Sequence, residues 1–372
     1  MPQRHRLRLA AILACSLSVI AQTPPKPEPD TLLLNDGEKL IGHLVRSSGG
    51  SVRFKSDAVG EVNVEWSKIR EFRSSAQFAV ISKDVKLGRK PVTTGIPEGT
   101  VSEADQKVEV AGPAGEKTVP VANVDQIVGL AAFNKETSGH EGFFRGWKGT
   151  ATLGASFVEA TQNSRTITDS VALVRAVPDQ DWLARRDRTS FDFSSSYGLL
   201  SQPNTPTVKT SIYHADAERD EYFSPAVFAF GQAQYDHNFS QGLDLQQTYV
   251  GGVGWSVFKQ PNQGLDLKGG ISFIRQQFSG TTTAKDLAAS VFDEKYLRKF
   301  FHGTTFTQEL SVSPAWTESK ALSAFGSAAL ALPVYKRFSV SVGATDNFLN
   351  DPPPGFKKNS EQFTTGLTYV LP

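Results

Sequence analysis

Side chains able to do acid–base or nucleophilic chemistry are few in this chain of 372 residues, which has six histidines and one cysteine. Nucleophilic catalysis needs a base hydrogen-bonded to a hydroxyl or thiol, and a third group that orients the base. Three histidines have a hydroxyl or a carboxylate close by in the sequence: His214 lies beside Tyr213 and Asp216, His237 beside Asp236, and His302 near Thr304. These three groups are the candidates for such a site.

The spacing within these groups does not favour catalysis. Successive side chains on a strand point to opposite faces, so Asp236 cannot simply pair with its neighbour His237. His214 and Asp216 share a face, but no serine-containing signature accompanies them. We therefore predict no catalytic residues and a protein that is not an enzyme. A barrel enzyme acting on lipid or peptide is an alternative that would depend on His214 or His237.

Metal and cofactor sites are not indicated either. His43, Glu65 and Asp125 share no metal-ligand spacing, and they fall at strand or turn positions expected to face water. The glycines of residues 251–254 stand inside a predicted strand with no helix after it, which excludes a phosphate-binding loop. They are better explained by a bend or a crowded lumen position. We expect no cofactor and no metal.

The elements that carry most of these residues are strands with alternating apolar and polar side chains. A period of two places one set of side chains on each face of a pleated strand. Strands of this kind, joined by short turns, predict an all-β fold with an antiparallel up-and-down transmembrane β-barrel over residues 147–372. The alternation is clearest in three runs: Phe191, Phe193, Tyr197 and Leu199; Leu243, Leu245, Tyr249, Val253, Trp255 and Val257; and Phe363, Leu367, Tyr369 and Leu371.

Clusters of Gly, Pro, Asn, Asp and Ser divide this region into about twelve strands. An even number is what a single-chain bacterial outer-membrane barrel has when both of its ends lie in the periplasm. The segment 286–300 alternates poorly, so a ten-stranded barrel is an alternative. The twelve strands are expected near residues 147–158, 164–177, 187–199, 207–220, 224–237, 243–258, 264–278, 286–300, 304–315, 319–332, 335–348 and 360–371.

Three features favour a membrane barrel over a soluble periplasmic β protein: long strands, simple hairpin connections, and small or polar residues opposite the large apolar ones. A formal net charge of +1 gives no electrostatic reason to expect nucleic-acid binding. We expect Phe228, Phe230 and Arg275 to fill the lumen. Aromatic side chains near the strand ends are expected to form interfacial girdles: Trp147, Tyr197, Tyr249, Trp255, Tyr335 and Tyr369.

The N-terminus carries targeting information. Residues 1–21 have the arginine-rich start and apolar run of a secretory signal peptide, with cleavage expected after Ala21. Lipidation at Cys15 is an alternative, because the residues before it loosely resemble a lipoprotein cleavage box. Cleavage at Ala21 would leave no cysteine and therefore no disulfide. Residues 22–29 are a proline-rich tether.

Residues 30–128 predict a small periplasmic β domain with a weak internal repeat. Each copy has the order strand, turn, strand, turn, strand and one helical turn, the helical turns being expected at residues 66–69 and 121–124. This is the order of a small SH3-like or Sm-like barrel, so we predict two half-repeats that pack on each other, since each alone buries little core. Residues 129–146 are expected to be a linker whose pair of phenylalanines meets the membrane surface.

The barrel region also resembles a known family. Three stretches carry the resemblance: residues 149–156 leading into 161–163, residues 232–236 before 251–255, and residues 352–359 before 365–369. Residues 147–371 thereby resemble the salt-induced outer membrane proteins, domain-of-unknown-function family 481. The resemblance implies an outer-membrane barrel and no established activity. Two residues depart from the pattern: Gln162, where the family often has glycine, and Pro372, where barrels usually end on an aromatic residue.

The sequence therefore predicts a non-enzymatic outer-membrane β-barrel protein of a Gram-negative bacterium, with a structural or salt-stress role in the envelope. A narrow pore or transporter for ions or small solutes is the first alternative. Expected partners are outer-membrane lipid and the barrel-insertion machinery, which would recognise the final strand. Lys357 and Lys358 are candidates for contact with lipopolysaccharide phosphates, and an ordinary solvated loop is the alternative that the sequence favours. No nucleic acid is expected, and the partner of the periplasmic domain is left open.

Overall fold

The structure is a computed structural model that describes residues 28–85, 95–113, 115–137, 142–159, 163–178, 183, 185–202, 206–260, 262–318 and 320–371. The predicted signal peptide, with Cys15 and Ala21, lies outside the described residues, as do most of the tether, Gln162 and Pro372. Within the described part of the chain, no helix has the length and apolar character needed to cross a membrane. The chain divides into two compact units, one ending at Phe133 and one beginning at Asn134.

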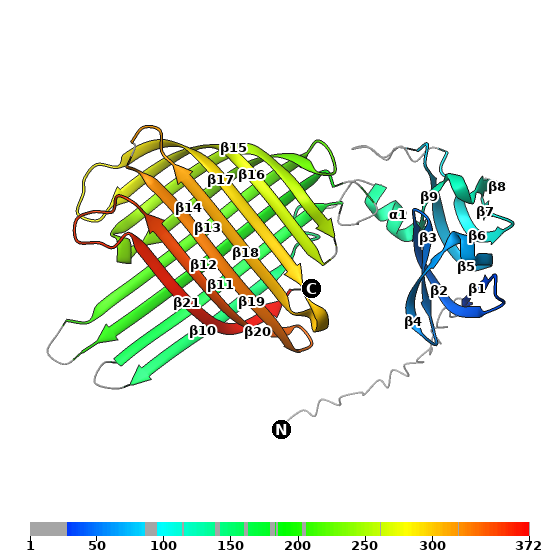
Figure 1. Ribbon diagram of the computed structural model, residues 1–372, viewed down its shortest axis with the longest axis horizontal. Coiled ribbons are helices and arrows are strands. Elements are labelled where there is room, and N and C mark those ends of the chain that lie inside the picture. Colours follow the sequence, from blue (N-terminus) through cyan, green and yellow to red (C-terminus); the bar gives the residue numbers. More distant parts are fainter. Residues whose placement is uncertain are drawn as a thin grey trace, which may run out of the picture. The chain divides into compact units, whose positions relative to one another are not determined.

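The N-terminal unit is a nine-stranded sheet with two 3-10 turns (Figure 1). Both turns lie where the internal repeat predicts them, so the order β2–β3–β4–η1–β5 recurs as β6–β7–β8–η2–β9. The elements are β1 (Asp30–Leu34), β2 (Lys39–Ser48), β3 (Ser51–Ser56), β4 (Gly60–Glu65), η1 (Trp66–Lys68), β5 (Ile69–Ser82), β6 (Glu98–Ala104), β7 (Lys107–Gly112), β8 (Gly115–Pro120), η2 (Val121–Asn123) and β9 (Val124–Gly129).

The closing strand of each half pairs with the first strand of the other half. β5 pairs with β6, placing Phe78 opposite Gly99, and β9 pairs with β2, placing Ile127 opposite Ser47. The halves are therefore not two separate barrels. They share one core, to which both halves contribute fully buried side chains such as Phe54, Phe72, Val108 and Ile127. Sharing the core offsets the small apolar area that each half would bury alone.

Helix α1 (Leu130–Thr137) occupies the first part of the stretch expected to be a linker. Phe133 is fully buried, which explains why this segment is ordered. Beyond it, Phe143 and Phe144 are 58% and 90% exposed. The indole Nε1–H of Trp147 donates a 2.9 Å hydrogen bond to the carbonyl of Phe143. The phenylalanine pair is thus held just before the first barrel strand, and its contact with a membrane stays a prediction.

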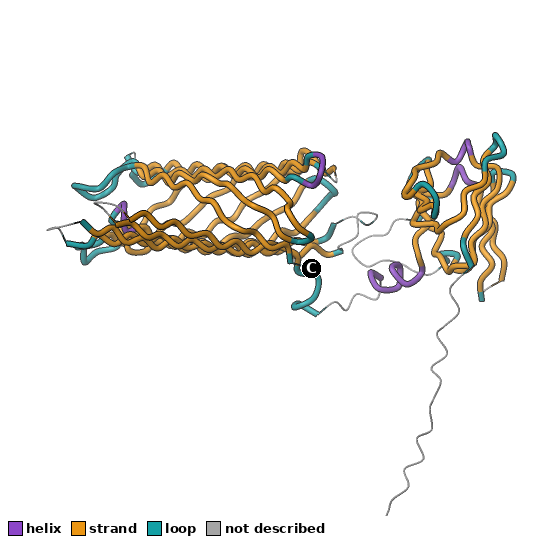
Figure 2. The backbone as a smooth tube through the Cα atoms, turned by 90° about the horizontal axis from the view of Figure 1, so that it is seen from below, coloured by secondary structure: helices purple, strands orange, loops and turns teal. Residues whose placement is uncertain are grey.

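The second unit is a closed barrel of twelve antiparallel strands, which confirms the predicted architecture (Figures 1 and 2). We call the end where β10 begins and β21 ends the terminal end, and the other end the distal end. The strands are β10 (Lys148–Glu159), β11 (Asn163–Val177), β12 (Asp187–Ser201), β13 (Val208–Tyr222), β14 (Val227–Asn238), β15 (Leu243–Gln260), β16 (Gln263–Phe278), β17 (Lys285–Lys299), β18 (Thr305–Pro314), β19 (Leu322–Tyr335), β20 (Phe338–Leu349) and β21 (Asn359–Val370).

Strand β17, which the sequence left in doubt, pairs with both of its neighbours. Its alternation is weak because Asp293 and Lys295 occupy the lumen face while Phe292 and Glu294 occupy the outer face. Lys268 of β16 lies opposite Asp293 of β17, and both side chains are almost fully buried. Charge on the inner face of a barrel does not weaken the strand. The ten-stranded alternative was wrong.

The outer face of the barrel carries the large apolar side chains. On β16, Leu267, Ile271 and Phe273 are exposed, whereas Lys268 and Ile274 on the opposite face are buried. Aromatic residues gather near both ends of the outer face. Phe338 and Tyr369 pack together at the terminal end, with ring centroids 5.1 Å apart, and Tyr235 and Tyr249 pack toward the distal end, with ring centroids 6.3 Å apart. Large apolar groups outside and polar groups inside are the pattern of a barrel that contacts lipid.

Two of the three predicted lumen residues lie in the lumen. Phe228 is fully buried and Phe230 is 5% exposed. The prediction for Arg275 was wrong, because Arg275 shares the outer face of β16 with Phe273. Its guanidinium lies 3.9 Å from the carboxylate of Asp286 on β17, and both side chains are more than half exposed. The distal position of Arg275 on its strand explains how a charge is tolerated on that face.

Candidate functional site in the barrel lumen

Charged side chains on the inner faces of β12, β13, β16 and β17 form a connected cluster, which we call the lumen ion-pair cluster. It comprises three carboxylates on β13 and β16, one carboxylate on β17, and two cations. Its members are Arg188, Glu218, Asp220, Asp266, Lys268 and Asp293, none more than 17% exposed. Cations and carboxylates alternate through the cluster, so each buried charge has a partner of opposite sign.

Arg188 joins strands that are not neighbours. Its Nε donates to Asp220 on β13 at 2.6 Å, and its Nη1 donates to Asp266 on β16 at 2.5 Å. Three strands lie between β12 and β16. The guanidinium also lies over the ring of Phe228, 5.4 Å from its centroid. The planar guanidinium suits this position because it can serve two carboxylates and a ring face at once.

Lys268 repeats this arrangement one layer along the barrel. Its Nζ lies 2.5 Å from Glu218 on β13 and 3.5 Å from Asp293 on β17. The ammonium also lies 5.0 Å from the ring centroid of Phe230. Two stacked layers, each with one cation, its carboxylates and one phenylalanine, therefore fill the lumen beside β13 and β16.

Two further contacts cross the lumen. Lys295 on β17 lies 3.8 Å from Asp192 on β12, with four strands between them. His214 on β13 stacks on Phe325 of β19 at a centroid distance of 6.1 Å. Five strands separate β13 from β19 on either side, so these rings come from opposite walls of the barrel. Side chains of facing walls therefore meet in the lumen.

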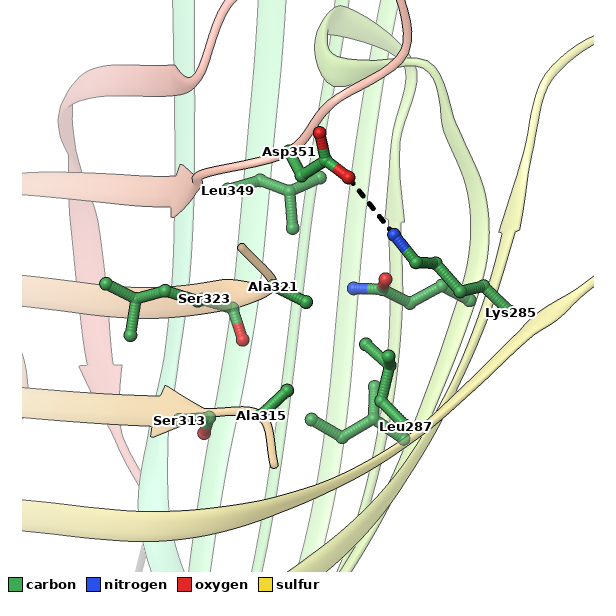
Figure 3. A pocket seen from close by; sticks show the side chains of 11 residues that line it. Lys285, Leu287, Ser313, Ala315, Ala321, Ser323, Leu349 and Asp351 are labelled. Atoms are coloured by element: carbon green, nitrogen blue, oxygen red, sulfur yellow. Dashed lines mark hydrogen bonds and ion pairs between the residues drawn. The ribbon is translucent and has the colours of Figure 1, made fainter. Parts of the chain in front are cut away.

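The distal mouth is bridged by loops. The side-chain amide of Gln241, in the turn η3 (Phe239–Gln241), donates to the carbonyls of Asn347 and Lys358 on the far side of the mouth. Nearby, Lys285 pairs with Glu318 at 2.7 Å. It also pairs with Asp351 at 3.1 Å (Figure 3). Between Lys285, Leu287, Ala321 and Leu349 lies a pocket of about 10 Å³, room for a single water.

The three candidate histidines lie on different elements: His214 on β13, His237 on β14 and His302 in a turn. His214 Nδ1 lies 2.7 Å from Asp236 Oδ1 on the neighbouring strand β14. The sequence pointed to Tyr213 and Asp216 beside His214, with Asp216 on the same face, and the cross-strand partner Asp236 was missed because register is not visible in the sequence. In the described residues, no hydroxyl is hydrogen-bonded to the other ring nitrogen of His214. The histidine and carboxylate of a triad are thus present without an aligned nucleophile.

The remaining candidates are dispersed. His237 bonds to the Ser211 hydroxyl at 2.9 Å and to the Asp244 carbonyl at 2.8 Å, on the face of β14 opposite Asp236. His302 stands in the turn η4 (Phe301–Gly303) with a positive φ of 60°. No hydrogen bond or ion pair joins any two of His43, Glu65 and Asp125 within the described residues. Nor do those residues contain a group of three or more potential ligands placed to hold a metal.

The glycines of β15 make room for the lumen phenylalanines. A Cβ added to Gly254 would lie 2.2 Å from the ring of Phe228, and one added to Gly252 would lie 2.8 Å from the ring of Phe230. Gly251, on the outer face, has nothing within 4 Å. The crowded lumen position predicted from the sequence is therefore correct for two of these glycines, which fix how closely the walls approach.

One shifted carboxyl lies outside the barrel, in the N-terminal unit. Burial raises the pKa of the Glu103 carboxyl on β6 from 4.5 to about 7, against the opposing effect of the Gln106 backbone N–H. That N–H donates to Oε1 at 3.2 Å, while the buried Oε2 has no hydrogen-bond partner within the described residues. This carboxyl is poised to titrate near neutral pH.

The charged residues of the lumen were not predicted, although the sequence contains a signal for them. Asp216, Glu218 and Asp220 occupy alternate positions of β13, on the same face as His214, while Ala215 and Ala217 occupy the other face. An acidic face opposite alanines identifies the inner side of a barrel strand. What the sequence does not contain is which cations meet these carboxylates.

Comparison with known proteins gives one family and several distant folds. Similar solved structures include the translocator domain of autotransporter NalP from Neisseria meningitidis (TM-score 0.33, 10% identity, 64% of this chain and 92% of that one). An outer membrane channel from Pseudomonas putida F1 has a TM-score of 0.36 and 9% identity, and the match covers 60% of this chain and 95% of that one. The β domain of the Bordetella autotransporter BrkA has a TM-score of 0.29 and 8% identity, and the match covers 60% of this chain and 97% of that one. No curated protein sequence matches the chain.

The family match covers the barrel. The family described as "Protein of unknown function, DUF481" matches residues 152–371. This range contains all of β11 to β21 and most of β10, and therefore the whole lumen ion-pair cluster. It includes more than half of the 372 residues, so the protein belongs to the DUF481 family.

Proposed function

We propose that this protein is a non-enzymatic outer-membrane protein of a Gram-negative bacterium, whose barrel anchors a periplasmic β module and does not conduct solutes freely. Its role is structural, in the envelope or in salt stress. The observation that supports this most directly is the set of contacts across the lumen, above all the His214–Phe325 stack between opposite walls. The apolar outer face supports the membrane location.

The lumen contacts favour a closed barrel on energetic grounds. Opening a solute path would separate Arg188 from Asp220 and Asp266 and leave buried charges without partners. Removing one partner of a buried pair costs about 3–5 kcal/mol. The narrow pore is the second candidate, and one observation favours it: Lys295 and Asp192 are 48% and 32% exposed inside the lumen. Water therefore reaches part of the interior.

The first experiment locates the protein. We expect expressed protein in the outer-membrane fraction, with gel migration that changes on boiling, as folded barrels show. Recovery in the soluble periplasmic fraction would refute the proposal. Accessibility of the N-terminal unit to protease from the periplasmic side only, in spheroplasts compared with intact cells, tests the position of the β module.

The second experiment measures conductance of the purified protein in planar bilayers. We expect no stable conductance from the native protein. The variant Arg188→Ser/Asp220→Ser/Asp266→Ser removes bulk and both signs of charge together, and should conduct. A matched control is available on the outer face, where Arg219 pairs with Asp187 and Glu221. The control variant Arg219→Ser/Asp187→Ser/Glu221→Ser should show no conductance. Stable single-channel steps from the native protein would establish the pore instead.

The remaining partners and the enzyme alternative belong to this proposal as well. The insertion machinery, outer-membrane lipid and lipopolysaccharide are the proposed partners, without nucleic acid. Lys357 is exposed, whereas the ammonium of Lys358 donates to Asn350 at 2.9 Å, which makes Lys357 the better lipopolysaccharide contact. In the enzyme alternative, a base at His214, paired with Asp236, predicts lipid or peptide hydrolysis that His214→Ala abolishes. A base at His237 predicts hydrolysis that His237→Ala abolishes.

A further inference from the structure

The strands that close the barrel are paired over only part of their length. β10 and β21 each have 12 residues, but their ladder contains only the pairs from Thr150–Val370 to Leu153–Leu367. A hydrogen bond from Leu371 N to Gly149 O extends it at the terminal end. Toward the distal end the two strands diverge (Figure 1). Within the described residues, no backbone bond joins residues 154–159 of β10 to residues 359–366 of β21.

Each strand is nevertheless fully paired on its other side. β10 pairs with β11 as far as Glu159, and β21 pairs with β20 from Asn359 onward. A second interrupted ladder, between β17 and β18, is filled: a bridge joins Ala289 to Ala315, and Trp316 N donates to Ala288 O. No comparable filling exists in the described residues of the β10–β21 seam. We call the unpaired part of this junction the open seam.

Two glycines mark the point where the seam opens. Extending the register of the ladder places Gly154 opposite Gly366. A Cβ at Gly154 would lie 2.4 Å from the carbonyl oxygen of Thr365, and one at Gly366 would lie 2.7 Å from that of Leu153. Only glycine permits this close crossing of the two backbones. Beyond it, each strand follows its own paired neighbour and the edges separate.

Unpaired strand edges are costly in hydrocarbon. Each unsatisfied backbone group there costs several kcal/mol, so an open seam at membrane depth requires polar groups or water beside it. The inner flank supplies them. The described residues that face the lumen beside the seam are uncharged, and hydroxyl groups predominate among them. They include Ser156 on β10, Thr166 and Thr168 on β11, and Gln362 and Thr364 on β21. The edges are therefore polar on the lumen side.

The outer flank carries large apolar side chains beside a few polar ones, Thr365 and Glu361 on β21 and Arg165 on β11. Leu153 and Phe157 on β10 are 63% and 66% exposed, and Phe363 on β21 is 82% exposed. These apolar side chains border the seam where it faces lipid. A molecule lying in the seam would place an apolar chain against them and a hydrogen-bonding head against the backbone edges and hydroxyls. Beside the open seam, the described lumen-facing residues of β10, β11 and β21 include no cation to hold a phosphate; Lys148, on the inner face of β10, lies at the terminal end.

A peptide strand fits this opening less well. β10 and β21 are antiparallel to each other. A single strand inserted between them would be antiparallel to one edge and parallel to the other, so it could not continue both ladders as they are built elsewhere in the barrel. A lipid chain has no such constraint.

We propose that the open seam is a lateral binding site for a single-chain lipid with an uncharged, hydroxyl-bearing head, of the monoacylglycerol class. The lipid enters sideways from the outer-membrane leaflet at the distal half of the barrel. Its head bonds to the free edges of β10 and β21, and its chain stays outside along Phe157 and Phe363. This inference rests on the proposed membrane location and is independent of whether the lumen conducts.

Disulfide trapping tests the seam geometry. Cys15 is the only cysteine, so engineered pairs in a Cys15→Ser background are unambiguous. Thr152→Cys/Thr368→Cys lies in the intact ladder, where the two hydroxyls are 2.8 Å apart, and should form a disulfide. Ser156→Cys/Thr364→Cys occupies the same register beyond the glycines and should fail to form one. Equal oxidation of both pairs in lipid nanodiscs would mean a closed seam and would overturn the proposal.

Photolabelling tests the ligand. A diazirine-bearing monoacylglycerol should label peptides containing residues 153–157 and 362–366, more than a single-chain phosphate lipid of equal length does. Thr364→Trp fills the opening and should abolish this labelling. Ser327→Trp on β19, an inward position paired on both sides, should leave it unchanged. Labelling spread evenly around the outer face, or equal for the anionic lipid, contradicts the site. Heat-modifiable migration of every variant verifies that the barrel itself has folded.

Discussion

At the residue scale, the lumen depends on charges that satisfy one another. Asp220 is 1% exposed and Glu218 is 7% exposed, positions in which an isolated carboxylate would be strongly disfavoured. Arg188 and Lys268 make these positions tenable, and Phe228 and Phe230 cover the cations. The cluster is better regarded as a device that fixes the arrangement of β12, β13, β16 and β17 than as a large source of stability, since a well-packed apolar cluster would serve equally well energetically.

Arg188→Ala should therefore be strongly destabilising. It leaves Asp220 and Asp266 buried without their cation, at a cost of about 3–5 kcal/mol. The midpoint of urea unfolding in detergent, followed by heat-modifiable migration, measures this cost. Arg275→Ala removes an outer-face pair with Asp286 whose side chains are both more than half exposed, and it should cost less than about 1 kcal/mol. Equal effects of the two substitutions would show that the lumen pair is not buried in solution.

The pH response of the N-terminal unit follows from Glu103. Its folded-state pKa of about 7 exceeds the ordinary 4.5, so the protonated form favours folding. The contribution is fully present below pH 4.5 and is lost as the pH rises through 7. Hydrogen-exchange protection of β6 and β7, corrected for intrinsic rates, should fall between pH 5 and pH 8. The corresponding free energy of opening should decrease by at most a few kcal/mol, on the order expected for one buried carboxyl.

The variant Glu103→Gln separates this effect from general pH sensitivity. It cannot ionise, so the pH-dependent loss of protection should vanish and the unit should be more stable at pH 8 by about 1–3 kcal/mol. Glu109→Gln, at an exposed position of β7, is the matched control and should retain the native pH profile. A profile unchanged by Glu103→Gln would assign the titration to another group.

At the element scale, two structural features bring strands together: strand exchange between the halves of the N-terminal unit, and close packing on the glycines of β15. In the N-terminal unit, β5 and β9 each close the opposite half, so neither half has a complete sheet by itself. In the barrel, glycines of β15 let the rings of Phe228 and Phe230 lie against the backbone. In both cases, segments that would bury little apolar area alone contribute to a shared core.

Gly254→Ala should disturb barrel packing. The added methyl would lie 2.2 Å from the Phe228 ring, which carries Arg188 on its face and has little freedom to move. We expect a loss of about 1–3 kcal/mol, as for other overpacked interiors. Gly231→Ala is the control, because nothing lies within 4 Å of its added methyl. Unfolding midpoints of the two variants should differ, and identical midpoints would mean that Phe228 relaxes freely.

At the scale of the whole molecule, the chain consists of two units with separate interiors. The shared core of the N-terminal unit is built from residues up to Ile127, and the barrel ladders close without it. The family match likewise begins at residue 152, within the first barrel strand. The barrel is therefore expected to assemble independently of the β module that we propose it anchors.

Deleting residues 30–133 tests this independence. The shortened chain should reach the outer membrane and keep its heat-modifiable migration, because every ladder of the barrel lies between Lys148 and Val370. The pair Thr152→Cys/Thr368→Cys, in the intact β10–β21 ladder, should still cross-link in it, which reports native register. Loss of the barrel on deletion would show that the N-terminal unit assists its folding or insertion.

The sequence by itself determined the strands and most of the architecture. The two-residue period, the turn residues and the even strand number gave all twelve barrel strands within a few residues of their observed bounds. The two 3-10 turns at Trp66 and Val121 were also predictable from the internal repeat. These features are local: side-chain alternation and turn chemistry act over a few residues, so they are visible in the chain itself.

The tertiary structure alone decided which residues meet. Arg188 with Asp266, His214 with Phe325, and the exchange of β5 and β9 all join segments whose proximity depends on register and curvature summed over several strands. One-residue changes of register reverse the face of every side chain, and the sequence does not report such offsets. The open seam is of the same kind, since it depends on where β10 and β21 finally cross.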